Sequence, residues 1–300
     1  MLMDVSVIII NFNTCIMTQE CIDSVFNYTK DIAFEVILVD NASTDGSKEH
    51  FERLDAEGTI RYVYSYENMG FGRANNVGMM LAKGDYIFLL NSDTYLKNNA
   101  IKIFFDYAES HERQAFYGGW LENAQGEMIH SGGKMMTIKS DLHNALLAFT
   151  TRIPILKKCS LTKNNDAIEN AMECQKVGYV TGADLFLHRS VIEKSGWFDH
   201  RFFMYCEESD WQKRAADKGI FSYIIKGPKI VHLQDYGKKT SVRGALMIID
   251  SKKLFFKKHY CGLKYICYRV SYFFIRVFPL LFNTNYAFRE RMKILHVLVK

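Results

Sequence analysis

A carboxylate that directly follows an apolar run is the strongest chemical signal in this sequence. Residues 86–90 read Tyr-Ile-Phe-Leu-Leu and are followed by Asn91, Ser92 and Asp93. A buried strand that ends in this way places the carboxylate at the carboxyl edge of a sheet, where α/β folds bind ligands. Carboxylate oxygens suit Mg²⁺ or Mn²⁺, which usually share them with a phosphate. An aspartate at such a position more often caps the next helix, so the elements around Asp93 are needed to decide between the two roles.

Three more strand patterns precede this one, and helical stretches separate them. The strands are expected at residues 5–10, 35–39, 60–64 and 86–90. Four strands alternating with three helical stretches predict an α/β fold with a parallel, doubly wound sheet. Because the carboxyl ends of parallel strands meet at one edge, the polar residues after the first two strands belong to the same candidate site as Asp93.

Asp40, at the end of the second strand pattern, is the candidate for holding a nucleotide. Its carboxylate can accept hydrogen bonds from a base N–H or a ribose hydroxyl. Capping the helix that begins near Asp45 is the alternative. Asn11, Asn13 and Thr14 follow the first strand and are expected to contact the base from the same edge.

A glycine-rich stretch at residues 68–73 precedes the third helical stretch. It lacks a full G-x-G-x-x-G with an acidic partner, which disfavours a dinucleotide site. A glycine turn into a helix offers free N–H groups to an anion, so Asn68 and Gly70 are candidates for binding a phosphate group of a ligand. Arg73 can add a contact to a diphosphate; a surface arginine is an equal alternative.

Several motifs, in one order and at one spacing, resemble those of family 2 glycosyltransferases, most closely the rhamnosyltransferase-type branch. They lie at residues 7–14, 39–47, 68–71, 89–93, 181–184, 196–199 and 202–210. The resemblance reaches about residue 245. It implies a GT-A fold with a Rossmann-like, mostly parallel sheet, a nucleotide-sugar donor, a divalent metal and inversion at the anomeric carbon.

The resemblance makes Asp93 the ligand of a divalent metal, Mg²⁺ or Mn²⁺, that stabilises the leaving diphosphate. Many relatives carry Asp-x-Asp here, and this sequence has Asn91 in the first position, which contacts the donor sugar or a metal-bound water. His232 matches a histidine that family members often place near the metal. Its alternative is a satisfied core histidine, and imidazole suits Mn²⁺ better than Mg²⁺.

The resemblance assigns the acid–base chemistry to Glu207-Glu208, ahead of a helix expected over residues 209–219. Family members usually carry Glu-Asp, with the second residue as catalytic base, so Glu208 is the expected base and Glu207 the fallback. A solvated acidic helix start is the alternative. Asp210 and Arg214 are spaced for a structural ion pair.

Four residues in the motifs at 181–184 and 196–199 are assigned to the sugars. Asp184 is expected near donor or acceptor hydroxyls, on the floor formed by residues 181–184. Trp197, Phe198 and Asp199 are expected to bind the acceptor, since a ring can stack on a sugar face while a carboxylate takes its hydroxyls. Trp197 as a core residue is a near-equal alternative.

Composition divides the chain unevenly. Residues 246–300 carry 11 Lys/Arg against 2 Asp/Glu, whereas the whole chain carries 38 against 33. We therefore expect a transferase domain over 1–245, with a nucleotide-sugar half at 1–105 and an acceptor half at 106–245, and a basic tail at 246–300. Residues 142–163 are interpreted only as an acceptor-side flap. The mildly acidic body argues against nucleic acid as a partner, and seven scattered cysteines indicate free thiols.

The tail predicts an amphipathic helix on an anionic membrane surface. Tyr265, Arg269, Tyr272 and Arg276 share one helix face and apolar residues the other; two central arginines argue against a spanning helix. Packing on the body or on a second copy, as in a homodimer, is the alternative. Because residues 5–10 are too short for a signal sequence, we expect a cytoplasmic protein on the inner face of the cell membrane.

These features favour an inverting transferase in bacterial surface-polysaccharide synthesis that moves a sugar to a lipid-linked oligosaccharide. A rhamnosyl donor such as dTDP-rhamnose and a UDP-sugar with another acceptor remain alternatives. A non-catalytic nucleotide-sugar-binding protein is disfavoured because Asp40, Asp93 and Glu208 are all present.

Overall fold

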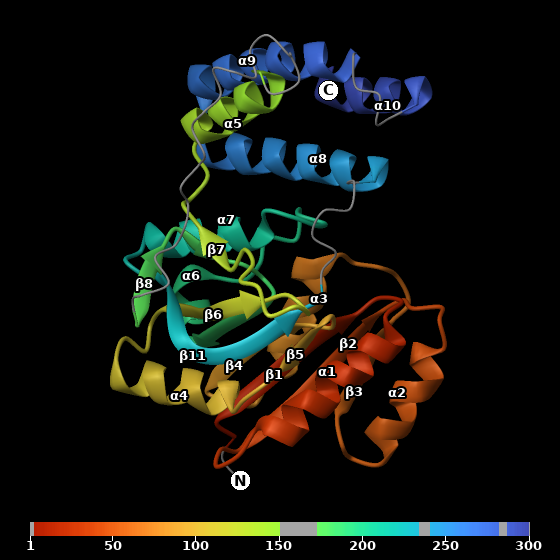
Figure 1. Cartoon of the computed structure of the whole chain (residues 1–300), viewed down its shortest axis with the longest axis vertical. Coiled ribbons are helices and arrows are strands. Elements are labelled where there is room, and N and C mark those ends of the chain that lie inside the picture. The colour runs from red at the N-terminus through yellow and green to blue at the C-terminus, as the bar shows by residue number, and fades with distance from the viewer. Residues whose placement is uncertain (1–2, 151–172, 234–240, 282–286, 300) are drawn as a thin grey trace. The chain divides into compact units, whose positions relative to one another are not determined.

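The computed structural model describes residues 3–150, 173–233, 241–281 and 287–299. The described chain forms two compact units (Figure 1). Unit 1 comprises residues 3–135, 173–203 and 207–233, and unit 2 comprises residues 136–150, 204–206, 241–281 and 287–299. Each unit is described by itself below.

The first part of unit 1 alternates strands and helices as the sequence predicts. Its elements are β1 (Val5–Asn11), α1 (Cys15–Tyr28), β2 (Phe34–Asn41), α2 (Ser47–Ala56), β3 (Arg61–Ser65), α3 (Phe71–Leu81) and β4 (Tyr86–Asn91). The strands are parallel in the order β3-β2-β1-β4. Each strand starts and ends within two residues of its expected position, because nearly uninterrupted apolar runs are buried on both faces of a parallel sheet.

The second part of unit 1 extends the same sheet with mixed strand directions (Figure 1). β10 is antiparallel to β4 and β6, β11 is parallel to β6, and β5 and β8 are antiparallel to β11. Its elements are β5 (Thr94–Leu96), α4 (Ala100–Ser110), β6 (Phe116–Glu122), β7 (Gly132–Gly133), β8 (Cys174–Val177), β9 (Tyr179–Val180), β10 (Asp184–His188), α6 (Arg189–Ser195), α7 (Glu207–Ala216) and β11 (Ser222–His232).

Two local features shape this part. A single bridge joins Glu122 and Met128, because the Asn123 side chain gathers the N–H groups of Gln125 and Glu127 into a turn. The last strand, β11, continues to His232. A bulge after Ile225 bends β11 without ending it.

The core of unit 1 contains a stack of aromatic rings. The Phe186 ring lies 5.1 Å from that of Tyr86 and 5.3 Å from that of Phe104, between centroids. All three side chains are buried. This packing fixes β4 against β10 and therefore fixes the loop that follows β4.

Unit 2 consists of helices. They are α5 (Ile138–Thr150), α8 (Val242–His259), α9 (Gly262–Leu281) and α10 (Phe288–Val299). α9 packs against α5 and α10, and α10 also packs against α8. The described part of segment 246–300 is thus helical, and it belongs to a unit that also includes α5. Of the expected acceptor-side flap, residues 142–150 belong to α5 and the rest lie outside the described residues.

Candidate functional site

The carboxyl edge of the parallel strands carries the predicted donor-binding residues. In the register of β1 and β2, Asn11 lies opposite Asp40, and in that of β1 and β4, Asn91 lies opposite Ile10. The backbone N–H of Asn91 also donates to the Ala183 carbonyl, 3.0 Å away, which continues the pairing of β4 with β10 and places the segment before β10 beside this edge. The sheet register therefore brings Asn11, Asp40 and Asn91 into one row.

A buried hydrogen-bond network surrounds Asp40. One carboxylate oxygen accepts from Asn11 Nδ2 at 3.0 Å, and the other accepts from the Ser43 N–H at 2.7 Å. The Asp40 side chain is fully buried, so it shapes the turn after β2, and any nucleotide contact must use its remaining lone pairs. Asn13 and Thr14 line the same turn: Asn13 Oδ1 accepts from the Thr44 N–H, and Thr14 Oγ1 donates to Asn11 Oδ1.

The glycine-rich stretch is a close-packed connection and not an open anion loop. Asn68 Oδ1 accepts from Asn41 Nδ2 and from the Gly70 N–H, both at 2.9 Å. The Phe71 N–H donates to the Phe203 carbonyl at 3.0 Å. The expected free N–H groups at Gly70 and Phe71 are therefore occupied. Gly70 has φ +84°, and a Cβ there would lie 2.1 Å from the Phe203 oxygen, so other residues are excluded.

The start of α3 also meets the start of α7. A Cβ on Gly72 would lie 3.1 Å from Phe198 Cβ and 3.6 Å from Glu207 Cβ. Arg73 is exposed and its Nε donates to the His200 carbonyl at 2.6 Å. Arg73 thus ties α3 to the loop before α7, and its predicted diphosphate contact stays a prediction. The motifs at 68–73 and 196–208, far apart in the sequence, are neighbours in space.

His232 and Asp93 meet at the end of the edge. β11 pairs with β5 so that His232 lies opposite Thr94, and the Leu233 N–H donates to the Asp93 carbonyl at 2.8 Å. His232 Nε2 lies 3.2 Å from Asp93 Oδ1 and 3.5 Å from Asn91 Nδ2. The His232 ring is buried, whereas the Asp93 side chain is 29% exposed. The two predicted metal ligands therefore come together, and Asn91 lies beside them.

These residues offer a divalent metal one carboxylate and one imidazole. Among the described residues, no three His, Cys, Asp or Glu side chains gather at one point. His232 Nδ1 is buried and has no hydrogen-bond partner within the described chain. A buried nitrogen without a partner is unusual, and a bound ligand is one explanation for it. The pair fits a cation that takes its other ligands from a diphosphate and water.

Glu207 and Glu208 begin α7. Glu207 is buried and Glu208 is half-buried, and burial raises the pKa of Glu208 above the usual range of a glutamate. The two residues that precede Glu207, Tyr205 and Cys206, have φ values of +71° and +65°, in the left-handed region. Non-glycine residues rarely adopt that conformation, and such strain is concentrated at functional sites. A carboxylate with a raised pKa at a helix start suits proton transfer.

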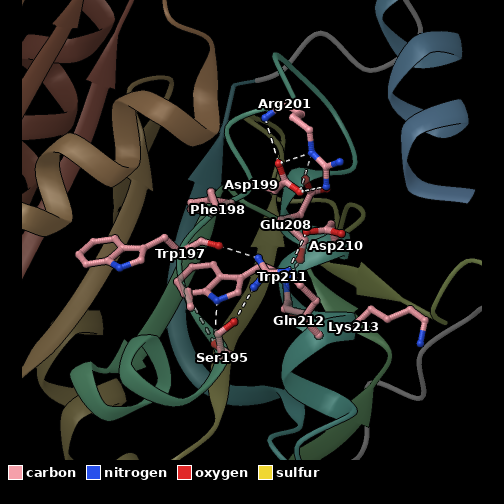
Figure 2. Close-up of polar contacts among 12 residues, drawn as sticks. Ser195, Trp197, Phe198, Asp199, Arg201, Glu208, Asp210, Trp211, Gln212 and Lys213 are labelled. Atoms are coloured by element: carbon pink, nitrogen blue, oxygen red, sulfur yellow. Dashed lines mark hydrogen bonds and ion pairs between the residues drawn. The ribbon is translucent and has the colours of Figure 1, made fainter. Parts of the chain in front are cut away.

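Arg214 fixes α7 to the loop before it. Its Nε lies 3.0 Å from Asp210 Oδ2, the predicted structural pair, and its Nη2 donates to the Trp197 carbonyl at 2.6 Å. Trp211, fully buried, donates from Nε1 to Ser195 Oγ at 2.8 Å (Figure 2). These contacts place Trp197 and Glu208 on segments that are held together.

The three predicted acceptor residues have different positions (Figure 2). Trp197 is 41% exposed and remains a candidate for stacking on a sugar. Asp199 forms a two-pronged ion pair with Arg201, with Nη2 2.6 Å from Oδ2. Phe198 is buried against Trp211, with ring centroids 4.6 Å apart, so it is a core residue and its predicted acceptor contact is withdrawn.

Asp184 also lies in the interior. It is fully buried, and its Oδ2 accepts from the Gly119 N–H at 2.6 Å. Its other oxygen has no partner among the described residues, and burial raises the pKa of this carboxyl well above the usual range. No surface of Asp184 is left for a sugar hydroxyl, so it supports the site from beneath and the predicted sugar contact is corrected.

Gln212 is a site residue that the sequence does not reveal. Its buried amide accepts from the Val180 N–H at 2.7 Å and donates to the Val180 carbonyl at 2.8 Å. It also accepts from Ser222 Oγ and donates to the Glu208 carbonyl. This side chain thereby joins α7 to β9 and β11. A glutamine in a mixed polar helix gives no signal of this role.

Several known proteins that resemble the chain are sugar transferases. The family model described as glycosyl transferase family 2 matches residues 6–195. The N-acetylglucosaminyl-diphospho-decaprenol L-rhamnosyltransferase of Mycobacterium tuberculosis is 25% identical over 209 residues, 66% of this chain and 66% of that protein. The poly(ribitol-phosphate) beta-N-acetylglucosaminyltransferase TarP of Staphylococcus aureus is 26% identical over 165 residues, 53% of this chain and 50% of TarP.

Solved structures share the fold. S. aureus TarS superposes with a TM-score of 0.57 at 13% identity, covering 94% of this chain and 44% of TarS. GalNAc-T7, solved with UDP, GalNAc and Mn²⁺, superposes with a TM-score of 0.60 at 15% identity, covering 88% of this chain and 53% of GalNAc-T7. These neighbours confirm the expected GT-A fold. Because the family model covers more than half of the sequence, the chain belongs to glycosyl transferase family 2.

Proposed function

We propose that this protein is an inverting glycosyltransferase that moves a sugar from a nucleotide-sugar donor to a lipid-linked saccharide during bacterial surface-polysaccharide synthesis. The meeting of Asp93 and His232 at 3.2 Å, at the same sheet edge as Asn11 and Asp40, carries this proposal. A polar edge of this kind suits a nucleoside diphosphate, with the nucleoside near Asn11 and Asp40 and the diphosphate charge neutralised near Asp93 and His232.

The donor residues act as a preorganised frame. Asn13 and Thr14 would face the nucleoside, and the buried Asn11 and Asp40 hold the turns that carry them. Asp93 and His232 would hold a divalent metal, which when bound stabilises the negative charge of the leaving diphosphate. Asn91, next to both, orients the donor sugar or a water molecule.

Glu208 acts as the general base. As the acceptor oxygen attacks the anomeric carbon, the bond to the diphosphate breaks, and the Glu208 carboxylate takes the acceptor's hydroxyl proton. One displacement inverts the anomeric centre. The raised pKa of Glu208 makes it a stronger base than an ordinary glutamate, while Trp197 and Asp199 lie on the neighbouring loop for the acceptor.

The similar rhamnosyltransferase, named for a lipid-diphosphate-linked acceptor, supports a lipid-linked acceptor and a rhamnosyl donor such as dTDP-rhamnose. A UDP-sugar donor is the second candidate; GalNAc-T7, which shares the fold, was solved with UDP. A lipid-linked acceptor places the enzyme at the cytoplasmic face of the membrane. In this proposal residues 1–245 form the transferase, 1–105 its donor half and 106–245 its acceptor half.

Release of nucleoside diphosphate from a panel of dTDP- and UDP-sugars, with Mn²⁺ and a polyprenyl-diphosphate-linked acceptor, tests this function. The expected result is acceptor-dependent release from one donor class, accompanied by a donor-dependent rise in melting temperature. A rise in melting temperature without release from any donor would identify a non-catalytic binding protein instead.

A further inference from the structure

Helix α9 turns its polar side inward. Tyr268 and Tyr272 are buried, and the Tyr268 hydroxyl donates to Asp141 Oδ2 on α5 at 2.9 Å. Burial and the neighbouring Asp141 raise the pKa of Tyr268, so its hydroxyl stays a donor. Arg269 donates to the Leu298 carbonyl at the end of α10. The Tyr and Arg face of this helix therefore packs within unit 2.

The opposite side of α9 is apolar and exposed. Leu263 is 74% exposed, Ile266 57%, Val270 52% and Phe274 67%. These residues are spaced three, four and four positions apart, so they form one stripe along the helix. A helix in water normally buries this kind of face, and a contiguous exposed apolar patch marks an interaction surface.

The charges around the stripe indicate what covers it. α9 contains no Asp or Glu, and Lys264 and Lys257 are exposed at and just before its first turn. Other tail cations are already used inside the unit: Lys252 pairs with Asp141, and Lys253 bonds the Val297 carbonyl. No described helix is long and apolar enough to cross a bilayer. An exposed apolar stripe with an exposed lysine in its first turn and no acidic group on its own helix fits the surface of an anionic membrane.

We propose that the α9 stripe, Leu263, Ile266, Val270 and Phe274, lies in the headgroup layer of an anionic membrane, parallel to its plane. The inference rests on the proposed function only in that a lipid-linked acceptor gives the enzyme a reason to be there. It assigns the membrane contact to a particular face, which the net charge of the tail does not do.

Cosedimentation of the full chain with vesicles tests this assignment. Replacing the four stripe residues with Ser should weaken binding to phosphatidylcholine–phosphatidylglycerol vesicles by at least about tenfold, because the inserted apolar area is lost. The control Met80→Ser with Tyr28→Ser removes two exposed apolar side chains of unit 1 and should bind like the wild type. Lys257→Glu with Lys264→Glu should reduce binding to anionic vesicles and make the residual binding insensitive to salt.

Two further measurements keep the inference separate from the proposed function. Circular dichroism should show an unchanged fold in the stripe variant, since all four side chains are exposed. The stripe variant should release nucleoside diphosphate as fast as the wild type when the acceptor is water-soluble. If the wild type itself releases none, the proposed function is wrong and the membrane inference is unaffected. The inference is overturned if the stripe variant binds vesicles normally, or if light scattering shows that the stripe holds two copies together.

Discussion

The sheet edge of unit 1 and helix α9 of unit 2 break the usual burial pattern in opposite directions. At the edge, Asp40 and His232 are polar and buried. On α9, Leu263 and Phe274 are apolar and exposed. Polar groups are normally buried only with partners, and apolar faces are normally covered.

The two departures are stabilised differently. At the edge, Asp40 is satisfied by Asn11 and Ser43, so the frame is rigid before any ligand arrives. On α9, the opposite side of the helix, with Tyr268 bonded to Asp141 of α5, holds the helix within unit 2, so the exposed stripe is not needed for its packing. If both proposals hold, the edge of unit 1 receives a small polar molecule, whereas the α9 stripe meets an apolar phase. Changes at the edge should alter chemistry, and changes on α9 should alter location.

The largest effect on the chemistry is expected from Asp93→Asn. Removing the carboxylate should lower kcat by about 10³-fold or more, since metal neutralisation of a leaving group is worth several kcal/mol. It should also abolish Mn²⁺-dependent stabilisation by nucleoside diphosphate, measured by thermal shift. Asp85→Asn, at the other end of the same strand, is the matched control and should leave both readouts unchanged. Undiminished wild-type activity after exhaustive EDTA treatment would contradict the metal assignment.

The next effect concerns the base. Glu208→Gln should lower kcat by roughly 10²–10⁴-fold while donor affinity stays within about threefold. In the wild type, kcat should fall as the pH drops through the raised pKa of Glu208, since only the carboxylate accepts a proton. That acid limb should lie above about 4.3, the ordinary glutamate value. If Glu207→Gln abolishes transfer and Glu208→Gln does not, the two roles are exchanged.

Much of the donor side could be predicted because its signals are local. An apolar strand followed by a carboxylate places Asp93 at the edge, and β4 ends one residue beyond the expected position. The approach of His232 was expected from the resemblance, but its register opposite Thr94 depends on β11 continuing past a bulge. No local pattern encodes that continuation.

The remaining differences come from tertiary burial. Asp184 looks like Asp40 and Asp93 in the sequence, yet it lies where β10 meets β6 and is sealed from solvent. Trp197 and Phe198 are adjacent aromatics, and only packing against Trp211 decides that Phe198 is the buried one. The partnership of α5 with α9 joins segments more than 100 residues apart, which helical periodicity cannot reveal.

A smaller, structural effect is expected at Gln212. Gln212→Leu leaves the N–H and carbonyl of Val180 without partners in the interior, so the free energy of unfolding should fall by about 2–4 kcal/mol. Chemical denaturation measures this change. Lys213→Gln, the next residue on the solvent side of α7, should stay within about 0.5 kcal/mol of the wild type. An unchanged midpoint in Gln212→Leu would mean that α7 is not held through this amide.

The smallest expected effect is a pH-dependent change in stability at Asp184. In the unfolded chain the pKa of this carboxyl is about 3.9. In the folded protein burial raises its pKa, so the carboxyl stays protonated to a higher pH. The folded state therefore binds more protons between the two pKa values, and stability falls as the pH rises through that window. Asp184→Asn cannot ionise and still accepts from the Gly119 N–H, so its melting temperature should exceed that of the wild type at pH 7 and match it near pH 4. Asp217→Asn, on the exposed part of an ion pair, should show no such crossover. If Asp184→Asn is less stable than the wild type at pH 7, the Asp184 carboxylate is ionised in the folded protein. The donor site would then lie near an additional buried negative charge.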